Sequence, residues 1–244
     1  MKTSVLFVLA VFMVFAATKT NAQVSGTKSN PKASAANTET PRKQGAYVTA
    51  TSSSALNSKS QLKGIEGKIF VGDDWPSGKV VLRNGGVIDN YYLRYNLLSD
   101  QMQFISGKDT LAFASPEELN SVAFDGHTFI YENYQCDKTI RQGYFEVIVP
   151  GKNKLLLKRL VTYEIPDAQN PDAGSSTKYM IDECYFISKP GQPANKMMCN
   201  RKSVLSELND HSVEMEEYLR ITGNKVRNPE ELKKMVTYYN SLDE

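Results

Sequence analysis

Few residues in this sequence are of the types that carry out acid–base, nucleophilic or metal chemistry. Its 244 residues include two histidines, His127 and His211, and three cysteines. It has no Gly-x-Ser-x-Gly elbow, no phosphate-binding loop, no dinucleotide-binding glycine pattern and no His-Glu-x-x-His motif. We expect His127 to be a solvated turn residue and His211 to be exposed at a helix start. The sequence therefore predicts no catalytic residue, no zinc site and no organic cofactor.

Calcium is the one metal for which the sequence offers plausible ligands. Residues 167–174 concentrate oxygen donors, and Asp167, Asn170 and Asp172 are the candidate calcium ligands. Their spacing departs from the Asp-x-Asp-x-Asp-Gly pattern of calcium loops. Because the same residue types fill long hairpin loops, an ordinary loop is the favoured interpretation of this segment.

Carboxylates also support an alternative function, a secreted glycan-directed hydrolase. Two Asp or Glu side chains from distant positions can together cleave a glycosidic bond. Asp73 and Asp74, next to the lone Trp75, and the acids of residues 167–172 are the candidates for such a pair. A turn explains Asp73 and Asp74 without any catalytic role.

Aromatic side chains are better candidates for ligand binding than the acids. They fall in or near predicted strands and turns, and aromatic faces on a rigid sheet can stack on a sugar ring or anchor a protein. Core packing is the alternative, since tyrosine is itself a strand former. The candidate binding residues are Trp75, Tyr91, Tyr92, Tyr95 and Tyr134, with Tyr131 and Tyr144 in the same regions.

The elements that must position these residues are short strands between residues 63 and 199. β-Branched and aromatic runs recur about every ten residues and are separated by Gly, Asn, Asp and Pro, which indicates antiparallel structure. The runs span residues 68–71, 79–83, 87–96, 102–106, 110–114, 122–124, 128–131, 144–149, 154–164, 178–188 and 196–199. A helical turn with Ser115 as N-cap is expected at residues 116–120. The region is predicted to be a meander, open roll or sandwich.

The period changes to that of helices in residues 200–244. Asn200 can cap a first helix, and Asp210 or Ser212 a second that ends near Gly223. The sequence Asn-Pro-Glu-Glu at 228–231 is the best start signal in the chain. We therefore predict an α+β fold in which two or three C-terminal helices pack on the β domain; a docking face for a partner helix is the alternative.

The amino-terminal 62 residues are expected to lie outside this fold. Residues 1–22 have a lysine, thirteen uncharged apolar residues at 5–17 and a small-residue end, which is typical of a cleaved secretory signal. The apolar stretch gives roughly 20 Å of helix, short of the roughly 30 Å of a bilayer core. Residues 23–62, rich in Ser, Thr, Ala, Asn and Lys, are predicted to be a disordered linker. No later segment is apolar enough to span a membrane, and a formal charge of +2 argues against a nucleic-acid partner.

Export suggests an oxidising compartment, so nearby cysteines are candidates for a disulfide. A hairpin centred between Gly191 and Gln192 pairs positions whose numbers add to 383, and Cys184 and Cys199 satisfy this condition. Such cross-strand neighbours lie about 4.5–5.5 Å apart, within reach of a disulfide. We therefore predict a Cys184–Cys199 disulfide, and we expect Cys136 to be an apolar filler.

Three segments resemble uncharacterised exported proteins of Gram-negative bacteria. They are Arg-Tyr-Asn-Leu-Leu-Ser-Asp-Gln-Met at 94–102, Gly-Tyr-Phe-Glu-Val-Ile-Val at 143–149 with residues 154–158, and the closing Tyr-Tyr-Asn-Ser-Leu at 238–242. The resemblance spans residues 77–242 and implies a periplasmic, outer-membrane-associated or secreted protein. It implies no activity and no catalytic residues.

The favoured hypothesis is an exported, non-catalytic binding or scaffold protein of the cell envelope. The linker, the modular layout and the shortage of reactive residues favour it over the hydrolase. Its expected partner is an envelope protein or a glycan, bound through an aromatic or helical face.

Overall fold

The computed structural model describes residues 50–52, 65–66, 69–72, 74–164 and 177–243. The predicted signal sequence, most of the predicted linker, Asp73 and the candidate calcium ligands Asp167, Asn170 and Asp172 lie outside the described residues. No helix among the described residues is long and apolar enough to cross a membrane.

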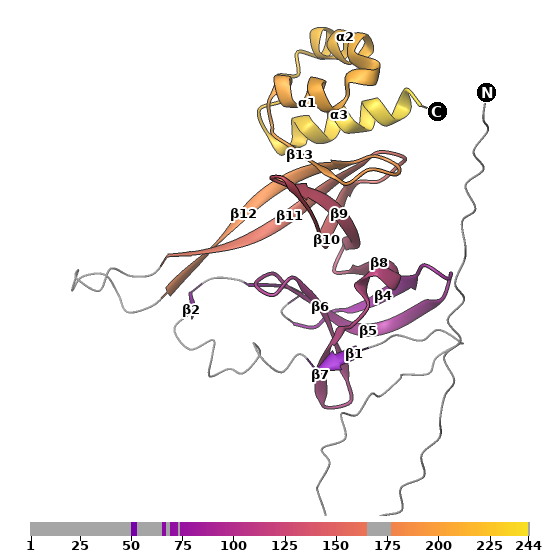
Figure 1. Cartoon of the computed structure of the whole chain (residues 1–244), viewed down its shortest axis with the longest axis vertical. Helices are drawn as coiled ribbons and strands as arrows, with labels where there is room; N and C mark the ends of the chain where they lie inside the picture. Colours follow the sequence, from indigo (N-terminus) through magenta and orange to yellow (C-terminus); the bar gives the residue numbers. More distant parts are fainter. Residues whose placement is uncertain (1–49, 53–64, 67–68, 73, 165–176, 244) are drawn as a thin grey trace, which may run out of the picture. The chain divides into compact units, whose positions relative to one another are not determined.

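Antiparallel strands form one hydrogen-bonded path, in the order β1-β7-β6-β5-β4-β8-β9-β10-β11-β12-β13, with β3 paired to β5 and β2 paired in parallel to β12 (Figure 1). The strands are β1 Ala50–Ser52, β2 Ile65–Glu66, β3 Phe70–Val71, β4 Ser77–Leu82, β5 Val87–Asn96, β6 Gln101–Ser106, β7 Asp109–Phe113, β8 Leu119–Phe124, β9 His127–Cys136, β10 Thr139–Val149, β11 Lys154–Glu164, β12 Thr177–Ser188 and β13 Asn195–Met197. A 3-10 turn, η1 Pro116–Glu118, precedes β8, and Ser115 makes no side-chain cap there. The α+β fold class is confirmed. β1 lies inside the segment for which composition predicts a linker.

Tight hairpins set the register of the strands. Phe124 pairs with His127 across the two-residue turn Asp125-Gly126, and both turn residues have positive φ. This is the backbone that a two-residue hairpin of right-handed twist requires. The β9–β10 hairpin extends well beyond the predicted runs, to a second two-residue turn after Cys136. The outer half of the hairpin, residues 132–143, lies between the predicted runs 128–131 and 144–149. The strand ladder nevertheless continues through it.

The β9–β10–β11–β12–β13 portion of the sheet closes on itself. Tyr134 in β9 bridges to Ala194, just before β13, and two backbone hydrogen bonds fix the contact: Gln135 N to Ala194 O at 2.9 Å and Ala194 N to Asn133 O at 2.8 Å. Five strands therefore surround a small apolar cluster. This inner cluster consists of Ile130, Phe145, Leu156, Phe186 and Ala194.

The larger apolar cluster lies in the first half of the sheet. It is built from buried residues of β4 through β10, among them Phe104, Phe129 and Tyr144. Rings in this cluster contact one another, for example Phe124 with Phe129 at 5.2 Å between centroids. Because its members come from many strands, the cluster fixes the first half of the sheet as a layer.

Three C-terminal helices pack on the closed part of the sheet, at the end near β13 (Figure 1). They are α1 Arg201–Glu207, α2 Ser212–Thr222 and α3 Pro229–Ser241, with a 3-10 turn, η2 Asn209–His211, before α2. Their buried side chains share a cluster with Val149, Leu155, Ile187 and Met197. We refer to it as the helical cluster.

The helix caps confirm two of the three predicted starts. The side chain of Asn200 accepts from Ser203 N at 2.8 Å, and that of Asn228 accepts from Glu231 N at 2.9 Å. The predicted cap of α2 is wrong, because the helix begins at Ser212 without a side-chain cap. Asp210 instead accepts hydrogen bonds from Tyr239 and Lys189.

The predicted Cys184–Cys199 disulfide is wrong, and the three cysteines are free. β12 pairs Tyr185 with Met197, so paired positions add to 382 rather than 383. A shift of one residue moves a side chain to the other face of a strand. Cys184 accordingly packs on the inner cluster and Cys199 on the helical cluster, on opposite faces of the sheet.

Candidate functional site

Two of the predicted binding aromatics belong to the core. Tyr95 is 3% exposed, and its hydroxyl donates to Asp100 Oδ1 at 2.6 Å. Burial and the neighbouring Asp100 carboxylate raise the pKa of Tyr95 well above its ordinary value. The ring of Tyr91 stacks on Phe104 with centroids 5.2 Å apart and an interplanar angle of 5°. Tyr95 is therefore enclosed in the core, and one face of the partly buried Tyr91 is covered by Phe104.

Trp75 has a partner within the chain, and Tyr92 is simply exposed. The guanidinium carbon of Arg94 lies 4.1 Å from the centroid of Trp75 and 3.8 Å from that of Phe70. This cation–π contact occupies one face of the indole. Tyr92 is 55% exposed on β5.

Tyr134, one of the predicted aromatics, lines a pocket. The pocket has a volume of about 580 Å³, within the range of small-molecule sites. It opens where the outer halves of the β9–β10 and β11–β12 hairpins face each other, and β13 and α1 complete its wall. Its polar lining residues include Arg141, Lys196, Asp137 and Glu207. We call it the Tyr134 pocket.

The Tyr134 ring is held rigidly. It meets Phe145 and Phe186 edge-on, with centroid distances of 5.3 and 5.6 Å, and those two rings also meet each other edge-on at 5.2 Å. Arg141 lies opposite Tyr134 in the β9–β10 ladder. Burial raises the pKa of Tyr134, although the Arg141 guanidinium beside it acts in the opposite direction. The ring therefore keeps its neutral hydroxyl at physiological pH.

A buried lysine forms the floor of the pocket. Lys158 is 4% exposed, and its ammonium donates to Asp100 Oδ2 at 2.9 Å and to Tyr144 O at 3.2 Å. It also lies 5.3 Å from the centroid of Tyr134 and 5.0 Å from that of Phe145. Because a buried charge is costly unless paired and hydrogen-bonded, these contacts are what permit a lysine at this position.

Gly143 leaves room for the ion pair. A Cβ at this position would overlap both the Lys158 ammonium nitrogen and the Asp100 carboxylate. Asp100 also accepts from Tyr144 N at 3.3 Å, so one carboxylate ties the β5–β6 turn to β10 and β11. The wall of the pocket is thus fixed to the first half of the sheet.

Sequence reasoning missed the Lys158–Asp100 pair. The available signal was a lysine directly after three leucines in a predicted strand, a place where a charge needs a partner. The partner is 58 residues away in the chain and no local pattern identifies it.

The expectation that His127 is a solvated turn residue is wrong. Its Nδ1 lies 2.6 Å from Glu146 Oε1, and Glu146, 8% exposed, also pairs with Arg159. His211 is only partly exposed, with Nε2 3.1 Å from Asp243 Oδ1. Both histidines therefore contact carboxylates that also pair with a basic side chain, Arg159 for Glu146 and Lys152 for Asp243.

The site contains no recognisable metal centre. No group of three or more His, Cys, Asp or Glu side chains is placed to hold a metal within the described part of the chain. Cys136 and Cys184 line the Tyr134 pocket as free thiols. Asp74, one of the acids considered for hydrolysis, is exposed, whereas its neighbour Asp73 and residues 167–172 are not described.

No protein-family model, no curated protein and no solved structure matches this chain.

Proposed function

We propose that this protein is an exported, non-catalytic binding protein of the cell envelope, and that it binds a glycan in the Tyr134 pocket. The leader-like pattern of residues 1–22 and the resemblance to exported proteins support the location. The residues of the pocket support the ligand class.

One observation carries the proposal: a rigid aromatic ring stands at a pocket whose rim offers both donors and acceptors of hydrogen bonds. Sugars present flat C–H faces surrounded by hydroxyls, and such faces pack well on aromatic rings. Arg141 and Lys196 can donate to hydroxyl oxygens, and Asp137 and Glu207 can accept from hydroxyl protons. The mixture of charges suits a polyhydroxylated ligand.

The state of Lys158 supports binding rather than covalent catalysis. A nucleophilic lysine needs a free amine. Here the nitrogen is engaged as a donor to the Asp100 carboxylate at 2.9 Å and to the Tyr144 carbonyl at 3.2 Å. Its role in the proposal is to hold the Tyr134 ring by a cation–π contact at 5.3 Å.

The test is binding of the full chain to a panel of soluble oligosaccharides of glucose, N-acetylglucosamine and galacturonate, measured by isothermal titration calorimetry. We expect at least one class to bind. The Tyr134→Ala variant should weaken that binding by about tenfold or more, as removal of a central aromatic anchor does. Tyr134→Phe should retain most of the affinity, because it keeps the ring.

The matched control is Tyr92→Ala, which removes an exposed tyrosine outside the pocket. It should bind as the unaltered chain does. Thermal melts of all variants separate loss of the site from loss of folding. Absence of binding to every oligosaccharide, or equal losses in the Tyr134→Ala and Tyr92→Ala variants, would contradict the proposal.

A further inference from the structure

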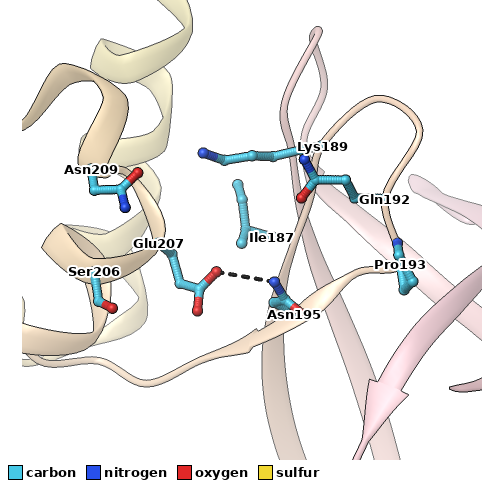
Figure 2. A pocket seen from close by; sticks show the side chains of 8 residues that line it. All are labelled: Ile187, Lys189, Gln192, Pro193, Asn195, Ser206, Glu207 and Asn209. Atoms are coloured by element: carbon cyan, nitrogen blue, oxygen red, sulfur yellow. Dashed lines mark hydrogen bonds between the residues drawn. The ribbon is translucent and has the colours of Figure 1, made fainter. Parts of the chain in front are cut away.

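A second hollow adjoins the Tyr134 pocket. It has a volume of about 240 Å³ and lies between the β12–β13 loop and the end of α1 (Figure 2). Figure 2 shows Ser206, Glu207 and Asn209 on the helical side, facing Lys189 and Gln192 of the loop. We call it the Asn209 hollow.

The two spaces share a wall. Asn195 and Glu207 line both, and Asn195 Nδ2 donates to Glu207 Oε2 at 3.3 Å, drawn as the dashed line in Figure 2. A bond of this length is at the weak end of the N–H···O range. A ligand hydroxyl can replace it, because it can accept from the amide and donate to the carboxylate at once.

The Asn209 hollow is lined by polar groups that the protein itself leaves unused. Within the part of the chain that the structure describes, no residue hydrogen-bonds to the side chains of Gln192, Ser206 or Asn209. Two amides and a hydroxyl around one space give paired donors and acceptors at several angles. This is the chemistry that recognises a further sugar.

From these observations we infer that the bound glycan is a chain: one sugar stacks on Tyr134, the chain displaces the Asn195–Glu207 bond, and the next sugars occupy the Asn209 hollow. This inference rests on the proposed function and adds the size class of the ligand. It predicts that affinity rises with chain length until both spaces are filled.

The experiment uses the full chain and N-acetylglucosamine oligosaccharides of one to six sugars, or the corresponding series of whichever sugar class binds. Titration calorimetry should give an affinity about tenfold higher or more for the longest oligomer than for the single sugar. In ¹⁵N spectra, the side-chain amides of Gln192 and Asn209, which line only the Asn209 hollow of the two spaces, should shift with long oligomers only.

Variants separate the two spaces. Asn209→Ala should weaken binding of the long oligomers by about fivefold, the value of one hydrogen bond, and leave the single sugar unaffected. Tyr134→Ala should weaken both. The matched control is Asn120→Ala, an exposed asparagine on β8, which should alter neither.

The outcomes are distinguishable. If every oligomer binds with the same affinity, the amides do not shift and only Tyr134→Ala lowers binding, the chain inference is overturned and the proposed function stands. If no sugar of any class binds, the proposed function fails and the inference fails with it.

Discussion

Two regions of the molecule place a cation against aromatic rings, with different consequences. In the first half of the sheet, the Arg94 guanidinium contacts both Phe70 and Trp75 at about 4 Å. In the closed part, the Lys158 ammonium lies further from Tyr134, at 5.3 Å, and is bound mainly by a carboxylate. The first arrangement places the guanidinium on one face of the indole, and the second places the ammonium over a phenol ring that lines a pocket.

The difference shows that an aromatic residue in a sheet becomes a ligand platform only if the protein does not cover its face. Arg94 can lie flat on a ring because a guanidinium is planar, whereas an ammonium acts as a point charge. The Lys158 ammonium is bound by Asp100, and both Lys158 and the Tyr134 ring line the pocket. Substitution of each cation or of its partner tests this difference between the two regions.

The largest expected effect comes from Asp100→Asn, which removes the charge that neutralises Lys158. The buried ammonium would keep only weaker partners, and Tyr95 would lose a charged acceptor. We expect a loss of about 2–4 kcal/mol in the free energy of unfolding, measured by urea denaturation. Asparagine also tolerates the positive φ of this position, so backbone strain is not added.

The control for this prediction is an exposed ion pair. Lys79 and Asp89 lie 3.7 Å apart with side chains more than half exposed. Asp89→Asn should cost less than about 0.5 kcal/mol, as surface pairs do. Equal losses in the two variants would mean that the Lys158–Asp100 pair is worth no more than a surface contact.

A smaller effect is expected from Arg94→Met. The variant keeps a long side chain but removes the cation–π contacts and the hydrogen bonds to Gln103, at 2.8 and 3.0 Å. We expect a loss of about 1–2 kcal/mol of stability. Oligosaccharide binding should not change, since the residue lies outside the Tyr134 pocket. A loss of oligosaccharide binding with unchanged stability would show that the Arg94 region, and not only the Tyr134 pocket, takes part in binding.

Local sequence patterns were sufficient for much of the fold. The strands at residues 87–96 and 154–164 were predicted with their observed bounds, and the start of α3 followed from its Asn-Pro-Glu-Glu sequence. Each of these depends on side chains a few residues apart, where periodicity and capping act directly.

The site could be predicted only in part, because it depends on distant pairs. Tyr134 is a candidate, but no local sequence pattern distinguishes it from Tyr95, which belongs to the core cluster, or from Tyr91, which packs against that cluster. The closure between Tyr134 and Ala194 is set by tertiary packing. The disulfide failed for a related reason: moving the centre of one loop by half a residue reverses the face on which each side chain lies.

A third cation–aromatic contact, among the helices, gives the smallest expected effect. Lys189 lies 5.3 Å from the Tyr239 centroid, and Asp210 accepts from both residues. Burial alone would raise the pKa of Asp210, but the hydrogen bonds from Tyr239 and Lys189 outweigh it and lower the pKa. A carboxyl with a lowered folded-state pKa stabilises the protein above its unfolded pKa, near 3.9, and the stabilisation is lost as the pH falls through the folded value.

Asp210→Asn should therefore flatten the fall in the free energy of unfolding as the pH drops below the unfolded-state pKa, about 3.9, and change little at neutral pH beyond the loss of the ion pair. The effect is small because the Asp210 side chain is half exposed and solvent screens its charge. Urea denaturation across this pH range measures the slope. An unchanged slope would show that the hydrogen bonds from Tyr239 and Lys189 do not lower the pKa of Asp210 enough to affect stability.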